Sequence, residues 1–194
     1  MFHVIGQQDE MLHFPFHSYN HVIDLLEDAA EDPMVSTIRI TLYRVAKGSQ
    51  IVKALEKALN NGKKVVVFIE VKARFDELSN IEQIAILKAA GADVHYDVPG
   101  LKVHSKMCLI TRNEPAGKKR YAYLSTGNFN EKTAKVYTDI GLFTADRAIT
   151  SDMKRVFQKL TGNEVEYKFK SLLVAPDHMP DKLCELIDKE IEFA

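Results

Sequence analysis

The sequence of 194 residues predicts an α/β fold, with a mixed sheet flanked by helices. Three observations support this prediction. Short runs rich in β-branched residues alternate with amphipathic stretches through the first half of the chain. One of these runs, KVVVFIE at 64–70, is almost wholly apolar, which is typical of a parallel strand covered on both faces. After Gly100 the expected strands follow one another without long helices, so we expect the sheet to gain antiparallel members.

The first half of the chain has well-marked element ends. The expected elements are a helix at 19–30, a strand at 37–43, a helix at 49–60, a strand at 64–70, a helix at 79–90 and a strand at 93–96. Ser49 caps the second helix, and Asn61-Gly62 ends it. This β-α-β-α-β order implies a largely parallel sheet with right-handed crossovers.

The second half is predicted to be richer in strands. The expected elements are strands at 103–111, 120–125 and 137–143, a helix at 149–160, a strand at 172–175 and a helix near 181–191. A strand, a proline and an amphipathic helix at this end weakly repeat the order seen at 12–15 and after it. We therefore expect one domain at 1–171 and the start of a second, similar domain at 172–194. Chance similarity of two common elements explains the repeat equally well.

Composition and charge narrow the class of function. The chain is 46% hydrophobic and 27% charged, as in ordinary globular proteins, and no apolar run approaches the roughly 20 residues of a membrane span. Cys108 and Cys184 lack C-x-x-C spacing, and they fit buried thiols of a reducing cytosol better than a disulfide or a zinc site. We therefore expect a cytoplasmic protein, with association at a membrane surface left open.

The net charge of −1 conceals two basic blocks. Residues 39–74 hold nine bases against two acids, and residues 100–137 hold eight against two. This pattern favours a local anionic ligand over general attraction to nucleic acid. Some of these bases lie in or at the ends of strand-like segments rather than on helix faces: Arg44, Arg74, Lys102 and Lys106.

A histidine and a lysine lie together in the second basic block. His104-Ser105-Lys106 is at the start of the strand expected at 103–111, and residues two apart on a strand point to the same face. The ammonium would attract phosphate and help keep the imidazole neutral, as a nucleophile must be. A neutral imidazole can attack phosphorus and form a phosphohistidine. The spacing alone is a weak signal, because incidental surface pairs share it.

A polar turn, STGNFN at 125–130, strengthens that signal. Backbone N–H groups and the amide of Asn128 could bind phosphate oxygens, although a plain turn is the simpler explanation of this segment alone. An H-x-K pair followed some twenty residues later by G-N resembles the half-motif of the phospholipase D superfamily. Those enzymes use a histidine nucleophile and build one site from two such halves. The usual Asp five residues after the lysine is Thr111 here, so the group that orients His104 is unidentified.

Nearly the whole chain is similar to the polyphosphate kinase family, the long ATP-dependent enzyme. The segments that carry this resemblance are TLYRVAKGSQIVKALEKALNNGKKVVVFIEVKARFDE, GLKVHSKMCLI, STGNFNEKTAKVYTDIGLFTAD and LLVAP. It implies a phospholipase D-like catalytic domain at 1–171 and a truncated second one at 172–194. It also implies a phosphorylated His104, an Mg–phosphate site at Arg44 and Arg74, and a nucleotide contact at Tyr137. Some members have a histidine where Tyr123 stands here.

The expected function is transfer of the terminal phosphate of ATP to polyphosphate, reversibly, through His104. Lys106 and Asn128 complete the expected phosphate-binding set, and charge neutralisation is the main catalytic requirement. Mg²⁺ is the expected cofactor, held through phosphate oxygens because an arginine cannot ligate it. The expected partners are ATP, ADP, inorganic polyphosphate, the remaining domains of a full-length enzyme and further copies of the chain, but no nucleic acid. Two alternatives remain open: a phosphodiesterase of the phospholipase D type, and a fragment that binds phosphate without turnover.

Overall fold

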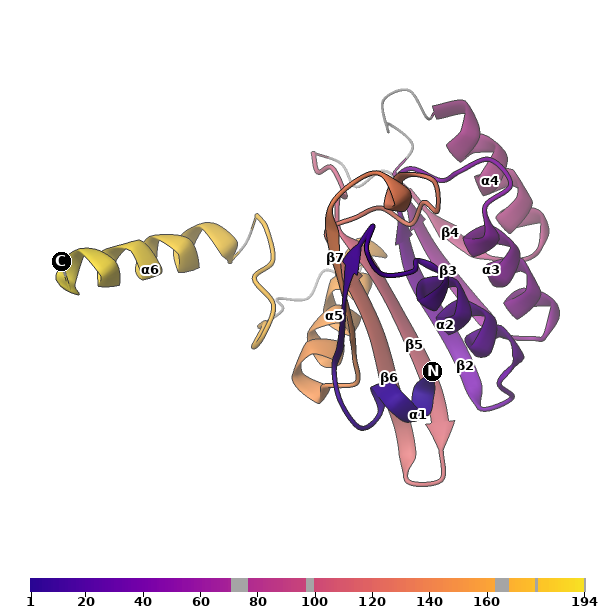
Figure 1. Cartoon of the computed structure of the whole chain (residues 1–194), viewed down its shortest axis with the longest axis horizontal. Helices are drawn as coiled ribbons and strands as arrows, with labels where there is room; N and C mark the ends of the chain where they lie inside the picture. Colours follow the sequence, from indigo (N-terminus) through magenta and orange to yellow (C-terminus); the bar gives the residue numbers. More distant parts are fainter. Residues whose placement is uncertain (71–76, 97–99, 163–167, 177, 194) are drawn as a thin grey trace.

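The computed structural model describes residues 1–70, 77–96, 100–162, 168–176 and 178–193. Within these residues seven strands form one sheet in the order β1-β7-β6-β5-β2-β3-β4 (Figure 1). The strands are β1 (Glu10–Phe14), β2 (Val35–Leu42), β3 (Lys64–Ile69), β4 (Asp93–His95), β5 (Lys106–Glu114), β6 (Gly117–Ser125) and β7 (Asp139–Thr144). The helices are α1 (Phe2–Ile5), α2 (Asn20–Glu31), α3 (Gln50–Asn60), α4 (Glu77–Ala89), the short 3-10 helix η1 (Thr133–Lys135), α5 (Arg147–Leu160) and α6 (Met179–Phe193).

The sheet has a parallel part and an antiparallel part, which confirms the predicted mixed α/β fold. β2, β3 and β4 are parallel neighbours. β5, β6, β7 and β1 each run antiparallel to the strand beside them. Because β5 is antiparallel to β2, the start of β5 lies at the edge of the sheet where β2 and β3 end.

Helices cover both faces of the sheet (Figure 1). α2, α3 and α4 lie over one face and share a core with β2, β3, β5 and β6. On α3, Ile51 and Leu55 are both 0% exposed, and each such burial stabilises the fold by about 1.5–3 kcal/mol. As predicted, Ser49 caps this helix, because its side chain accepts a hydrogen bond from Ile51 N. On the other face, α5 packs on β5 and β6 through Met153 and Phe157.

Two predicted strands need correction. The strand expected at 103–111 begins at Lys106 instead, so His104 precedes it. The segment 172–175 forms no strand. Its neighbouring backbone instead donates hydrogen bonds to the fully buried Asp152, whose Oδ2 accepts from the N–H groups of residues 170, 171 and 172 at 2.7, 2.7 and 3.1 Å. Burial alone would raise the pKa of Asp152, but these donors and Arg155 lower it.

The C-terminal helix α6 projects away from the body of the protein (Figure 1). None of its described residues is buried. Its exposed apolar side chains include Leu183, Ile187 and Ile191. Cys108 is a buried free thiol as expected, whereas Cys184 is exposed on α6, so the expectation of burial was wrong there. That residues 172–194 begin a second domain stays a prediction. In the part of the chain described, no helix has the length and apolarity of a membrane span.

Candidate active site

His104 lies at the edge of the sheet where the parallel strands end. It belongs to an extended segment just before β5, beside the residues that follow β2 and β3. Ligand sites in open α/β sheets commonly form beyond the carboxyl ends of parallel strands. The fold therefore places the predicted nucleophile where side chains from several elements converge.

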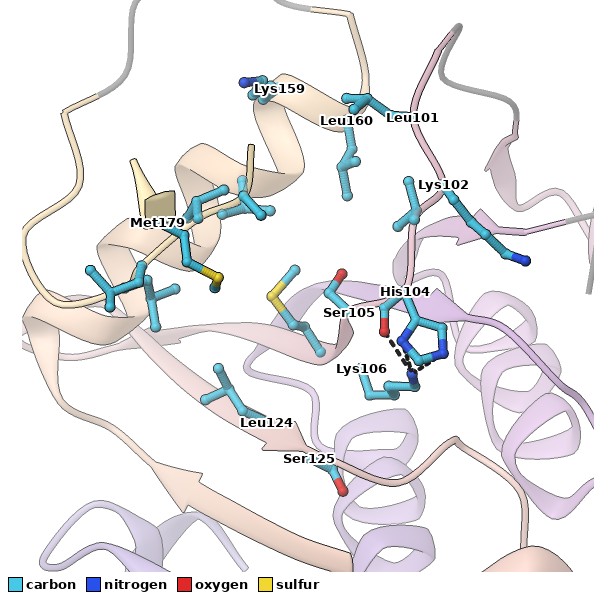
Figure 2. A pocket seen from close by; sticks show the side chains of 17 residues that line it. Leu101, Lys102, His104, Ser105, Lys106, Leu124, Ser125, Lys159, Leu160 and Met179 are labelled. Atoms are coloured by element: carbon cyan, nitrogen blue, oxygen red, sulfur yellow. Dashed lines mark hydrogen bonds between the residues drawn. The ribbon is translucent and has the colours of Figure 1, made fainter. Parts of the chain in front are cut away.

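Lys106 contacts His104 directly, as the H-x-K spacing predicts. Lys106 Nζ lies 2.9 Å from His104 Nδ1 and 3.0 Å from Nε2, and it donates a hydrogen bond to the His104 carbonyl oxygen at 2.6 Å (Figure 2). His104 is exposed, whereas only 6% of Lys106 is. The two residues do not share a strand face, because His104 lies outside β5. The lysine side chain instead folds back over the segment that precedes its own strand.

Burial and neighbouring cations tune both groups. Partial desolvation lowers the pKa of His104, and Lys106, Lys102 and Arg44 lower it further by repulsion. The imidazole is therefore neutral at pH 7 and carries the lone pair that a nucleophile needs. Burial lowers the pKa of Lys106 to about 8, with attraction by Asp139 acting to raise it and repulsion by Arg44 to lower it. With that pKa, about nine-tenths of the lysine is still protonated at pH 7.

Buried polar side chains hold the backbone around His104. Thr41 Oγ1 donates a hydrogen bond to Ser105 O at 2.6 Å and accepts one from Met107 N at 2.9 Å. Glu70 Oε2 accepts a hydrogen bond from Val103 N at 3.2 Å. The residues on both sides of His104 are therefore fixed by the ends of β2 and β3.

An aromatic ring also lies against His104. The rings of Tyr43 and His104 are edge-to-face, with centroids 4.6 Å apart and an interplanar angle of 82°. The cationic groups of Lys106, Lys102 and Arg44 lie 5.3, 5.5 and 5.8 Å from the centroid of the Tyr43 ring. Sequence reasoning did not single out Tyr43, although it stands next to Arg44 in the segment TLYR.

The structure brings some of the other predicted residues to this site. The side chain of Arg44 acts on both His104 and Lys106, so it lies close to them. Asn128 is half-buried, and within the described residues its buried Oδ1 has no hydrogen-bond partner. Tyr137 is 60% exposed, and no contact places it beside His104. Arg74 lies outside the described residues, so its predicted role stays a prediction.

The STGNFN turn is tied to the site through backbone and side-chain contacts. Ser125, at its start, pairs with Lys106 across β5 and β6. Asn130 Nδ2 donates a hydrogen bond to Arg44 O at 3.2 Å. Thr126 Oγ1 donates one to Asp139 Oδ1 at 2.8 Å, and Asp139 in turn attracts Lys106. Asp139 thus accepts a hydrogen bond from the turn and also acts electrostatically on Lys106.

Glycine at position 127 has a clear steric reason. A Cβ atom at Gly127 would lie 2.5 Å from Asp139 Oδ2 and 2.7 Å from its Cγ. Real Cβ atoms do not approach this closely, so any other residue would displace the carboxylate. The turn residue therefore allows the contact between Thr126 and Asp139.

Tyr123 and Thr111 stand where related motifs carry other residues. Tyr123 is 1% exposed and packs against Phe129 and Phe143 in the core. Burial raises its pKa to about 12. Thr111 is also buried, at the register position opposite Arg120, five residues along β5 from Lys106. Both side chains thus lie in the interior of the protein.

The side chains around His104 fit a metal ion that is held mainly by phosphate oxygens of a bound substrate. Among the residues that the structure describes, no three His, Cys, Asp or Glu side chains gather to hold a metal ion. The groups nearest the imidazole are cations. Mg²⁺ takes oxygen ligands and commonly binds through substrate phosphates with one or two carboxylates. Among the described residues, Asp139 and Glu70 are carboxylates near His104 that could contribute, with phosphate oxygens and water as the remaining ligands.

A cavity of about 540 Å³ adjoins His104 (Figure 2). Its polar side holds His104 and Lys106. Its other side is apolar, with Leu160 from the end of α5 and Met179 from the start of α6. The cationic site thus opens onto an apolar hollow formed by the C-terminal part of the chain.

The fold and the H-x-K pair at this sheet edge define a phospholipase D-like domain. Nuc from Salmonella typhimurium, a phospholipase D family member, shares the fold with a TM-score of 0.62 at 14% identity, over 83% of this chain and 98% of that chain. Residues 1–166 match the polyphosphate kinase C-terminal domain 1, and the chain therefore belongs to the polyphosphate kinase family.

Two further relatives are more similar. The polyphosphate kinase of Vibrio vulnificus (strain CMCP6) is 44% identical over 193 residues, which cover 100% of this chain and 28% of the relative. The crystal structure of polyphosphate kinase from Porphyromonas gingivalis has a TM-score of 0.88 and 46% identity, over 97% of this chain and 32% of that chain. The chain thus spans less than a third of the length of these relatives.

Proposed function

We propose that this chain supplies the phosphoryl-accepting half of a polyphosphate kinase active site. The observation that carries this proposal is the contact between His104 and Lys106, in which Nζ lies within 3.0 Å of both ring nitrogens. A neutral imidazole held beside an ammonium can act as a nucleophile toward a phosphate that the ammonium attracts. Because the chain belongs to the polyphosphate kinase family, we take ATP and inorganic polyphosphate as the proposed substrates.

The proposed reaction has two steps. One imidazole nitrogen of His104 attacks the terminal phosphorus of ATP, the bond from that phosphorus to the bridging oxygen breaks, and ADP leaves. A terminal oxygen of polyphosphate then attacks the phosphohistidine phosphorus, the N–P bond breaks, and the polymer gains one phosphate. The same steps in reverse make ATP. The imidazole begins and ends each cycle neutral, in accordance with its lowered pKa.

The remaining residues bind and orient phosphate in this proposal. Lys106 and Arg44 neutralise the phosphate charge as the phosphoryl group transfers. Asn128, with its unpartnered Oδ1, lies in a turn tied to the site, and Arg74 and Tyr137 are assigned by family resemblance. Mg²⁺ would bind phosphate oxygens near Arg44 and Arg74, and it would supply charge neutralisation there.

The rest of the longer polypeptide is proposed to complete this site. The relatives are more than three times as long as this chain, and phospholipase D-like sites combine two halves. His104 is exposed and faces an open cavity, as expected for one half of such a site. Association of further copies of the chain stays a proposal as well.

Labelling with γ-labelled ATP and Mg²⁺ tests the proposal. We expect acid-labile, alkali-stable label on the chain. The label should be lost in His104→Ala and kept in His3→Ala, whose histidine is exposed on α1 near the opposite end of β5 and β6. Polyphosphate binding without label in either protein would indicate a binding fragment. Cleavage of a phosphodiester substrate by the wild type and not by His104→Ala would overturn the kinase assignment in favour of a phosphodiesterase.

A further inference from the structure

The packing of the His104 imidazole raises a question that the H-x-K motif does not answer. Related half-motifs carry an Asp five residues after the lysine, where this chain has the buried Thr111 on β5. The contact with Lys106 Nζ does not fix the ring, because Nζ is almost equally far from both nitrogens, at 2.9 and 3.0 Å. An imidazole that could rotate would offer its lone pair in the wrong direction for much of the time.

We propose that Tyr43 is a positioning residue for His104, and that its aromatic ring rather than its hydroxyl carries this role. The two rings meet edge-to-face at 82° with centroids 4.6 Å apart, within the range where aromatic pairs attract. Tyr43 is only 8% exposed, so its ring is held by the surrounding protein, whereas His104 is exposed. The buried ring therefore limits the orientation of the exposed one.

The same ring also gathers the cations of the site. Lys106, Lys102 and Arg44 each place their charge 5.3–5.8 Å from its centroid. These charges repel one another, and the negative face of an aromatic ring partly offsets that repulsion. The ring thus helps to keep these three cations around His104 before an anion is bound. A leucine of similar bulk would fill the space but would not attract the cations.

The buried side chain of Asn80 connects the backbones that carry Tyr43 and His104. Asn80, which is 0% exposed on α4, donates hydrogen bonds to Tyr43 O at 2.8 Å and to Glu70 O at 3.0 Å. Glu70 in turn accepts the hydrogen bond from Val103 N, next to His104. The backbones that carry Tyr43 and His104 are therefore tied together through Asn80 and Glu70. This connection explains how residues from separate segments keep a fixed ring contact.

Two tyrosine variants and one control test the inference. Tyr43→Phe keeps the ring, and Tyr43→Leu removes it. The control, Tyr96→Leu, removes a ring that follows β4, three strands from β5 in the sheet, and that also carries a cation, with Lys88 Nζ 4.8 Å from its centroid. The first measurement is the NMR spectrum of the His104 ring protons in each chain, assigned by their absence in His104→Gln. We expect the signals to shift in Tyr43→Leu and to stay in place in the other two variants, because only that change removes the ring current.

The second measurement is the rate of phosphohistidine formation, and this part rests on the proposed function. At saturating ATP we expect Tyr43→Leu to slow labelling about tenfold, with Tyr43→Phe and Tyr96→Leu within about twofold of the wild type. The ATP concentration for half-maximal rate should change less than about threefold, because orientation rather than binding is lost. Far-UV circular dichroism monitors the fold of each variant.

The outcomes separate the inference from the proposed function. Unshifted His104 signals in Tyr43→Leu, or a labelling rate equal to that of the wild type, would refute the positioning role. A Tyr43→Phe protein as slow as Tyr43→Leu would also refute the role of the ring, because the hydroxyl would then be the group that matters. Tyr43→Phe also keeps the inference testable if Tyr43→Leu does not fold. If the wild-type chain takes no label, the proposed function is refuted, and so is any role of Tyr43 in that reaction. The NMR comparison does not depend on labelling, and it still decides whether the Tyr43 ring holds the His104 imidazole.

Discussion

Raising the pH should remove the charge of Lys106 and, with it, phosphohistidine formation on His104. Burial lowers the pKa of Lys106 to about 8. For that pKa the protonated fraction falls from about nine-tenths at pH 7 to about one-tenth at pH 9. The initial labelling rate at low ATP concentration should therefore fall about tenfold over this range, because that rate reports on the groups of the free protein. Labelling with γ-labelled ATP in a series of buffers measures the decrease.

The acid side of the same profile reports on His104. Desolvation and the nearby cations lower its pKa, so the imidazole stays neutral to a lower pH than an ordinary histidine, whose pKa is about 6.5. The acid limb of the rate profile should therefore lie below the pH at which an ordinary histidine titrates. The whole profile is a bell whose acid limb belongs to the nucleophile and whose alkaline limb belongs to the ammonium.

Two variants at lysine positions decide whether this assignment is right. Lys106→Arg should lose the alkaline decrease up to pH 9, because a guanidinium stays protonated up to a pH of about 12. Its rate at pH 7 should also be lower, because the fork of the arginine cannot occupy the place of Nζ. Lys102→Arg, at an exposed position, should keep the alkaline limb. A decrease near pH 8 that persists unchanged in Lys106→Arg would refute the reasoning.

Three substitutions test the supports of the site and of the fold. Asp152→Asn should lower the free energy of unfolding by about 2–4 kcal/mol in urea titrations, whereas Asp181→Asn at an exposed position should change it little. Because the folded-state pKa of Asp152 is lowered, its stabilisation is present above the unfolded value of about 3.9 and is lost as the pH falls through the folded-state pKa. Gly127→Ala should displace Asp139 and slow labelling about three- to tenfold. Asn80→Ala leaves buried backbone groups unpaired and should lower the unfolding free energy by about 2–4 kcal/mol in thermal or urea melts.

Most of the sheet was predictable because its signals are local. The Ser49 cap, the turn at Asn61-Gly62 and the apolar run of β3 each depend on neighbours in the sequence. The start of β5 was predicted three residues too early for a reason that is not local. The hydroxyl of Thr41 takes the backbone groups of residues 105 and 107, so the ladder between β2 and β5 ends there. The pattern of apolar and polar residues around His104 does not reveal these hydrogen bonds to Thr41.

The same distinction applies to the site. The H-x-K spacing correctly predicted that Lys106 meets His104, although the strand geometry used to justify it was wrong. Tyr43 could not be found this way, because an aromatic residue after a strand usually belongs to the core. Its role depends on how β2 and the segment before β5 come together in three dimensions. The sequence therefore predicted the chemical groups of the site better than the contacts that orient them.

Exposure of the site fits the proposal that a second half completes it. Two unit charges 4 Å apart attract by about 1 kcal/mol in water and by about 4 kcal/mol at an effective dielectric constant of 20. His104 is exposed, although Lys106 is buried, so much of the field of Lys102 and Arg44 is screened by solvent. A cover over the cavity would expel that water and strengthen every contact to phosphate without any new charge. The apolar wall of the cavity, which Met179 continues into α6, is the kind of surface against which such a cover can pack. In the proposed mechanism, this desolvation would strengthen the attraction between the cations around His104 and the phosphate that is transferred.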